Sequence, residues 1–153
     1  MTLSANINVE TKKSPVITKL KCVDGALAIY RGALLEYEKS NIGYVQPASA
    51  DVAQTNQSEF AGIALEEKTV AAADNTADGT IEISVLSRGC GDWVLLTSSS
   101  ALTIAHEGDP VYMKNDLYVA TSATNSTGGF VGIIRQFVST TTAWVQLVQS
   151  PTL

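Results

Sequence analysis

Short stretches in which hydrophobic and polar residues alternate recur along much of this chain. In Thr80–Leu86 every second residue from Ile81 to Val85 is hydrophobic, so an extended strand here would have one apolar face and one polar face. The pair Asp78-Gly79, just before it, favours a tight turn. No stretch of about ten residues keeps a helical period. With eleven glycines in the chain and turn signals about 8–12 residues apart, the pattern predicts an all-β domain, either a barrel or a sandwich.

One series of landmarks occurs twice in the same order. The matching pairs are Gly32–Leu35 with Gly108–Val111, Tyr44-Val45 with Tyr118-Val119, and Phe60–Leu65 with Phe130–Ile134. We therefore predict one β domain, residues 21–153, built of two similar units at about 21–87 and 88–153. Ile63 and Ile133 should occupy equivalent core positions. Gly62 and Gly132 should lie where two backbones approach closely.

The first twenty residues do not resemble core sequence. They are rich in Thr, Ser, Asn and Lys, and Pro15 disfavours a helix. Because Val16-Ile17 is β-prone, we interpret residues 1–20 as an extended arm that contacts another subunit or surface, for instance by adding a strand to an exposed edge. The alternative is a partly disordered terminus. The residues predicted to bind the partner are Lys12, Lys13, Pro15, Val16, Ile17 and Leu20.

Composition limits the classes of partner. Hydrophobic residues make up 45% of the 153 residues and charged residues 16%. Such low charge fits a surface that is covered by something else, or a strand-rich domain with Thr and Ser on its surface. The net charge of −5 argues against a nucleic-acid partner. No apolar run approaches the roughly 20 residues of a membrane span, and no secretory h-region is visible.

The candidate chemistry is sparse. His106, the only histidine, falls in a predicted turn, and no Gly-x-Ser-x-Gly elbow accompanies it. Asp74–Gly79 resembles the start of a calcium loop but has Val85 where the bidentate glutamate belongs, so a turn explains it better. Cys22 and Cys90 lack metal or redox spacing, and we expect free thiols rather than a bridge. We predict no cofactor, no metal and no enzymatic activity.

The order of the landmarks resembles that of the capsid cement (head decoration) proteins of tailed bacteriophages. The residues that carry the resemblance are Arg31–Leu34, Phe60–Leu65, Arg88-Gly89, Gly108–Tyr112 and Phe130–Ile133. The resemblance covers roughly residues 21–148. The chain departs from the family pattern at Cys90–Trp93 and in its long polar arm.

The resemblance implies a β-tulip-like or related small β-barrel that binds the outer surface of the mature phage shell. The implied partner is the major capsid protein, the implied assembly is a homotrimer, and the implied location is the virion exterior after synthesis in the host cytoplasm. The competing hypothesis is an adhesive β module of the head or tail that binds a host surface glycan. That module would need aromatic platforms in loops, whereas most aromatic residues here fall in predicted strands.

Overall fold

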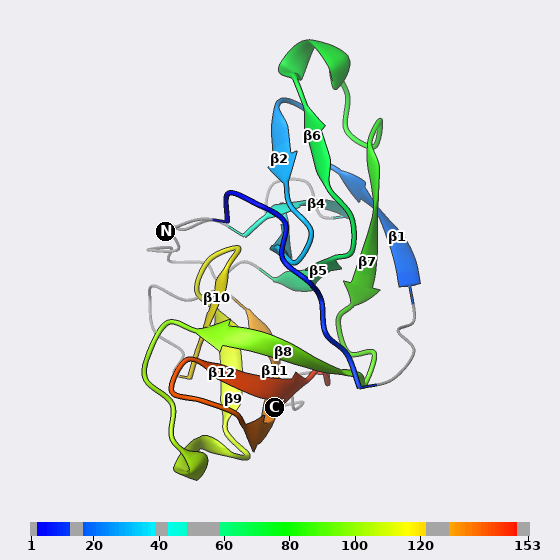
Figure 1. Ribbon diagram of the computed structural model, residues 1–153. Coiled ribbons are helices and arrows are strands. Elements are labelled where there is room, and N and C mark those ends of the chain that lie inside the picture. Colours follow the sequence, from blue (N-terminus) through cyan, green and yellow to red (C-terminus); the bar gives the residue numbers. More distant parts are fainter. Residues whose placement is uncertain (1–2, 13–16, 39–42, 49–58, 122–128, 150–153) are drawn as a thin grey trace.

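The computed structural model describes residues 3–12, 17–38, 43–48, 59–121 and 129–149. These residues form two closed five-stranded β-barrels, one above the other in Figure 1. The first barrel, unit 1, contains β1 (Ile17–Cys22), β3 (Leu34–Tyr37), β4 (Tyr44–Pro47), β5 (Phe60–Ala64) and β7 (Glu82–Ser87). The second, unit 2, contains β8 (Trp93–Ser98), β9 (Pro110–Met113), β10 (Tyr118–Ala120), β11 (Phe130–Phe137) and β12 (Thr142–Gln146). The predicted all-β fold is confirmed.

The two barrels have the same topology. Their strand orders, β1-β4-β3-β5-β7 and β10-β8-β12-β11-β9, match when β1, β3, β4, β5 and β7 are equated with β8, β9, β10, β11 and β12. In each barrel one pair is parallel, β1 with β4 and β8 with β10, and the others are antiparallel. The register agrees too, since Tyr44 lies opposite Lys21 and Tyr118 opposite Thr97. The duplication seen in the sequence is therefore a duplication of structure.

The strand that carries the repeated phenylalanine and glycine has a β-bulge at the same position in both units. Phe60 lies opposite Glu36, and Phe130 lies opposite Tyr112, each followed by a register shift before the glycine. A β-bulge inserts one extra residue and bends the strand, so it is a specific feature rather than a chance fit. The bulges place Phe60 and Phe130 at equivalent points, as predicted.

The glycines of these strands lie where backbones nearly touch. A Cβ atom added to Gly62 would lie 2.6 Å from the carbonyl oxygen of Leu86 on β7. A Cβ atom on Gly132 would lie 2.1 Å from the carbonyl oxygen of Gln146 on β12. The predicted close approach is confirmed at both positions.

The prediction for the two isoleucines was half wrong. Ile63 and Ile133 are equivalent in register, since they pair with Leu34 and Pro110. Ile63 is buried, whereas Ile133 is only half-buried. The reason is that the outer face of unit 1, including Ile63, packs against unit 2, whereas Ile133 belongs to neither buried cluster of the described residues.

The two barrels share a hydrophobic core. One buried cluster joins Leu34, Phe60, Ile63 and Leu86 of unit 1 to the interior of unit 2, including Met113. A second cluster fills unit 1 around Cys22, Leu35, Val45, Ile83 and Val85. Burial of such side chains stabilises the fold by about 1.5–3 kcal/mol each. The first cluster therefore joins the outer face of unit 1 to the interior of unit 2, and the second fills unit 1 itself.

Unit 1 carries an addition that the described residues of unit 2 do not form. A two-stranded ribbon of β2 (Leu27–Ile29) and β6 (Lys68–Val70) rises above the barrel in Figure 1 and is capped by a 3₁₀ turn, η1 (Ala72–Asp74). The residue that follows η1, the buried Asn75, donates from Nδ2 to the carbonyl oxygens of Val23 and Gly25, each at 2.9 Å. The calcium-like segment is therefore a connection from η1 towards β7, held in place by Asn75.

The expected boundary between arm and barrel was wrong. The arm was predicted to extend to Leu20, but β1 begins at Ile17 and pairs with β7 from Ile17 to Lys21. The pattern concealed this strand because Ile17, Lys19 and Lys21 alternate with Thr18 and Leu20, so neither face of the strand is clearly apolar. Unit 1 therefore starts at residue 17, among the described residues.

Candidate interaction surfaces

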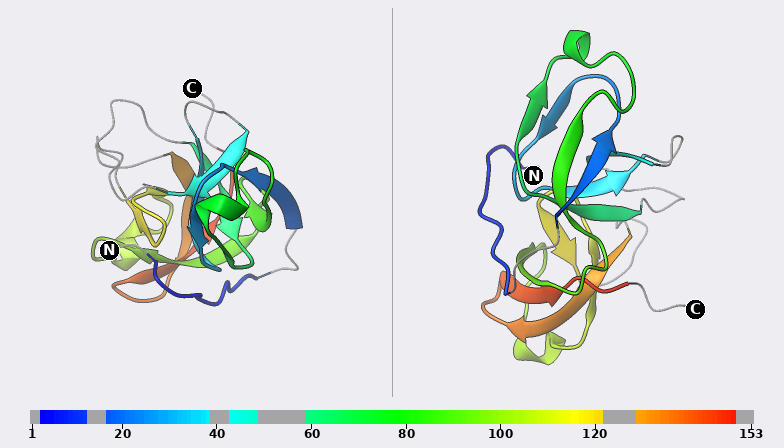
Figure 2. Two further views of the ribbon diagram at one scale, coloured as in Figure 1. Left: turned by 90° about the horizontal axis from the view of Figure 1, so that it is seen from above. Right: turned by 90° about the vertical axis from the view of Figure 1, so that its right-hand side faces the viewer.

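The segment of residues 3–12, here called the arm, lies along its own chain. Figure 2 shows it running down one side of the molecule from unit 1 to unit 2. Leu3 is buried, and its backbone nitrogen donates to Asp116 Oδ1 at 3.0 Å. Asn6 receives the backbone N–H of Arg31 at 2.7 Å and donates from Nδ2 to Glu67 at 2.7 Å. The described part of the arm is thus fastened to both units.

The end of the arm adds a short strand to unit 2. Thr11 forms an antiparallel bridge with Val94 of β8. The backbone nitrogen of Lys12 donates to the carbonyl oxygen of Trp93 at 3.1 Å, and that of Leu95 donates to Glu10 at 3.2 Å. Strand addition was expected at the edge of a neighbour, and the structure shows it within the chain.

The six predicted partner-binding residues are distributed as follows. The ammonium of Lys12 lies 4.2 Å from the centre of the Trp144 ring, a cation–π contact that holds its side chain against unit 2. Ile17 and Leu20 belong to β1, where Ile17 is exposed and Leu20 packs on the core of unit 1. Lys13, Pro15 and Val16 lie outside the described residues. Binding to another chain stays a prediction for all six.

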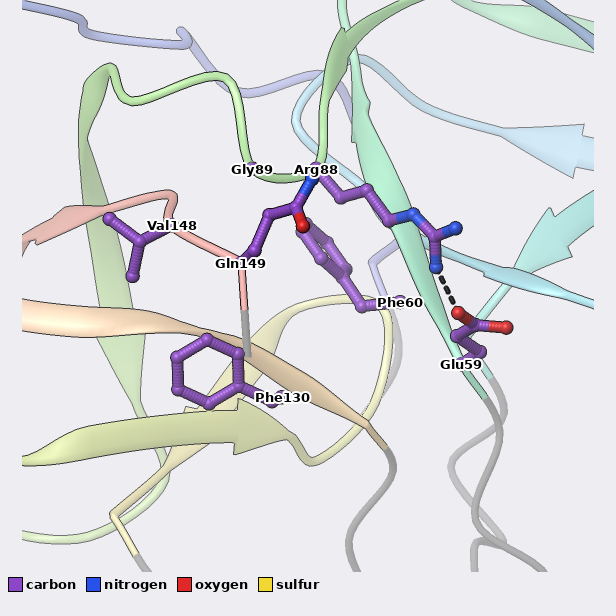
Figure 3. A pocket seen from close by; sticks show the side chains of 7 residues that line it. All are labelled: Glu59, Phe60, Arg88, Gly89, Phe130, Val148 and Gln149. Carbon is purple, nitrogen blue, oxygen red and sulfur yellow. Dashed lines mark hydrogen bonds and ion pairs between the residues drawn. The ribbon is translucent and has the colours of Figure 1, made fainter. Parts of the chain in front are cut away.

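A cleft opens where the two units meet. It encloses about 330 Å³ and is lined by Glu59, Phe60, Arg88, Gly89, Phe130, Val148 and Gln149 (Figure 3). The register equates Phe60 with Phe130, Arg88 with Val148 and Gly89 with Gln149. Equivalent ends of the two units therefore build opposite walls of one cleft.

The two charged residues of the cleft lining form an ion pair with each other. Arg88 forms an ion pair with Glu59, drawn as the dashed line in Figure 3, and its guanidinium lies 5.2 Å from the centre of the Tyr37 ring. The exposed ion pair contributes little to stability. Phe60, Phe130 and Val148 supply the apolar lining. The one carboxylate of the lining, Glu59, is paired with Arg88, and the apolar part of the cleft could receive an apolar or aromatic side chain of a partner.

The two tryptophans lie on the outer side of unit 2, on neighbouring strands. Trp93 on β8 lies opposite Gln146, and Trp144 on β12 lies opposite Leu95. Both rings are half-buried, and Lys12 covers part of Trp144. Sequence reasoning missed this pair, although the alternation in β8 and β12 already placed Trp93 and Trp144 on the face away from the core.

The remaining chemical candidates have local structural roles. His106 ends the 3₁₀ turn η2 (Ile104–His106), and its Nδ1 accepts the backbone N–H of Thr103 at 2.9 Å. Among the described residues, no group of three or more His, Cys, Asp or Glu side chains lies together in a way that could hold a metal ion. In the same part of the chain no helix is long and apolar enough to cross a membrane.

Both cysteines are free thiols, as predicted. Cys22 is fully buried in β1, and burial raises the pKa of its thiol to about 11. The thiol is therefore protonated at neutral pH and unreactive while the protein is folded. Cys90 is half-buried in the connection between the units.

A scan against protein-family models and a search among curated proteins both find no match for the chain.

Proposed function

We propose that this protein is a structural component of a tailed-bacteriophage virion, which binds the outer surface of the mature capsid and stabilises it. Its partner would be the major capsid protein, and it would bind as a homotrimer. The order of landmarks that resembles the cement proteins supports this proposal, and the position of those landmarks adds to it. Phe60 and Phe130, with their glycines, form equivalent bulged strands of two matching barrels.

The described surface fits a protein that binds rather than one that catalyses. One hydrophobic cluster joins its two barrels, and a body held together in this way can contact a shell without changing shape. Among the described residues, four large hydrophobic side chains are exposed, Ile7, Ile17, Ile104 and Val138. Exposed single hydrophobic residues are ordinary, but a contact repeated over a capsid lattice needs only a small patch on each copy.

A host-glycan adhesin is the second candidate, and the half-buried Trp93 and Trp144 favour it. A tryptophan ring offers a broad apolar face together with an N–H donor. Against it, the ammonium of Lys12 occupies part of the Trp144 face. Trp144 also stands in a strand of the barrel wall rather than in a loop that could enclose a sugar.

Cosedimentation separates the two candidates. The purified chain is mixed with expanded shells that lack it, with unexpanded shells and with host cell-surface polysaccharide. The cement function predicts saturable binding to expanded shells only, with trimers detected by light scattering. Binding to the polysaccharide alone, quenching tryptophan fluorescence, would instead establish the adhesin.

A further inference from the structure

The duplication allows the two units to be compared edge by edge. In unit 2, β10 pairs with β8 only at Thr97 and Ser98. The preceding part of the same edge, from Trp93 to Leu95, is covered by the arm through the Thr11–Val94 bridge. In unit 2 an added strand therefore extends this edge.

No described strand covers the corresponding edge of unit 1. There β4 pairs with β1 only at Lys21 and Cys22. The register equates Ile17, Thr18 and Lys19 with the three arm-covered residues of β8. These three residues pair with β7 on one side, and no strand among the described residues pairs with them on the other. In Figure 1 this half of β1 borders the molecule beside β7.

The edge Ile17–Lys19 of β1 presents the same kinds of backbone group as the part of β8 that pairs with the arm. In β8 these groups are a carbonyl oxygen and, two residues later, an N–H. Along β1 the sides alternate, because the N–H of Cys22 faces Ile81 and that of Val23 faces Val45 of β4. The carbonyl oxygen of Ile17 and the N–H of Lys19 consequently point away from β7. One acceptor and one donor are thus placed to receive an antiparallel strand.

The side chains of this edge indicate what kind of strand it would receive. Ile17 is 60% exposed, and Thr18, Lys19 and Lys21 are exposed as well. Glu82, opposite Lys21, is the acidic residue facing β1 from β7. In a chain of net charge −5, two exposed lysines on one short strand favour an acidic partner segment.

We propose that the edge Ile17–Lys19 of β1 binds an extended acidic segment of the major capsid protein as an added antiparallel strand. The inference rests on the proposed capsid function and specifies where the contact lies. Pairing would satisfy the outward carbonyl oxygen of Ile17 and the outward N–H of Lys19, and it would cover the side chain of Ile17. It would also remove an edge that otherwise invites aggregation.

The test uses two substitutions at one residue. Lys19→Pro removes the outward N–H without touching the groups that face β7, and proline is tolerated at such edge positions. Lys19→Ala keeps the N–H and removes the charged side chain beyond Cβ. Binding of the wild-type chain and both variants to expanded shells is measured at low and high salt, after light scattering of the free proteins.

We expect Lys19→Pro to weaken shell binding by roughly tenfold or more. Lys19→Ala should bind nearly as well as the wild type at high salt and lose part of its salt dependence. Equal binding by Lys19→Pro would overturn the inference while leaving the capsid function standing. If the wild-type chain did not bind expanded shells, the capsid function would be contradicted. The capsid protein could then not be the partner of the β1 edge either.

Two further readouts keep the test decisive. If Lys19→Pro does not fold, amide hydrogen exchange in the wild type replaces it, and the Lys19 amide should exchange more slowly on shells than in the free chain. Unchanged exchange overturns the inference. If Lys19→Pro instead dissociates an oligomer of the free chain, a second copy occupies the edge, which also overturns it.

Discussion

At Gly132 the backbone of β11 passes so close to β12 that no side chain fits between them. The neighbour is the Gln146 carbonyl, a backbone group that cannot turn aside as a side chain would. Gly62 occupies the equivalent position of unit 1, where the neighbour is the Leu86 carbonyl. These two contacts explain why a glycine stands in both copies of the repeated strand.

Gly132→Ala should therefore lower the free energy of unfolding by about 2–3 kcal/mol, the usual cost of overpacking a core. Gly91→Ala is the matched control, because a Cβ there meets nothing within 4 Å and only its positive φ of 83° opposes the change. That control should cost about 1 kcal/mol. Urea unfolding measures both, and equal effects would show that the close approach is unimportant.

Asp116 joins three parts of the molecule. Its carboxylate accepts the N–H of Leu3, and its carbonyl oxygen accepts the N–H of Leu34 at 2.9 Å. Burial raises the pKa of this carboxyl, although the hydrogen bond from Leu3 opposes the shift. The folded state therefore holds the proton more tightly than the unfolded state does. This group's contribution to stability is present at acid pH and is lost as pH rises through the raised pKa.

Asp116→Asn removes the charge but keeps an oxygen that can accept from Leu3. We expect the variant to be more stable than the wild type at pH 7, with a smaller difference near pH 4, where an aspartate begins to be protonated. Urea unfolding at both pH values measures this, with the exposed Asp24→Asn as control. A variant that is less stable than the wild type at pH 7 would contradict the assignment.

Among the elements, the arm and β1 differ most from expectation. Val16-Ile17 looked β-prone, and β1 does begin at Ile17, but its partner β7 lies more than sixty residues away in the sequence. Alternation within one segment cannot identify such a partner, or show that Ile17 and Lys19 lie on an uncovered edge. The repeat was easier to predict, because each unit carries the same landmarks in the same order and that order can be read directly from the sequence. Trp93 and Trp144 come together only through the pairing of β8 with β12.

Removal of residues 1–12 should destabilise the domain without preventing its folding. Leu3 is buried in the core of unit 1, and Val9 packs on the shared core. Losing two such contacts costs several kcal/mol, about 1.5–3 for each fully buried side chain. Leu3→Ala alone should account for roughly half of the loss. Thermal unfolding tests this, and an unchanged melting temperature would mean that the arm does not hold the position described here.

At the scale of the whole molecule, the hydrophobic cluster that joins the two units holds them together. Leu34, Ile63 and Leu86 would be exposed if unit 1 stood alone, because they are buried against unit 2. Their equivalents on unit 2 are Pro110, Ile133 and Gln146, which are exposed or half-buried. The two copies of this face therefore have different roles. The copy on unit 1 packs against unit 2, and the copy on unit 2 faces outward. Sequence comparison of the two units gave no sign of this difference in role beyond the polar Gln146.

The capsid proposal is tested most directly by the heat stability of the shell itself. Expanded shells lacking the protein are heated with and without the chain at about 100 times its dissociation constant, at which each occupied site gains about 2.7 kcal/mol. We predict that the calorimetric transition of the shell moves to higher temperature as sites fill. A shell transition that stays in place when the sites are saturated, or a chain that does not bind expanded shells, would contradict the proposed function.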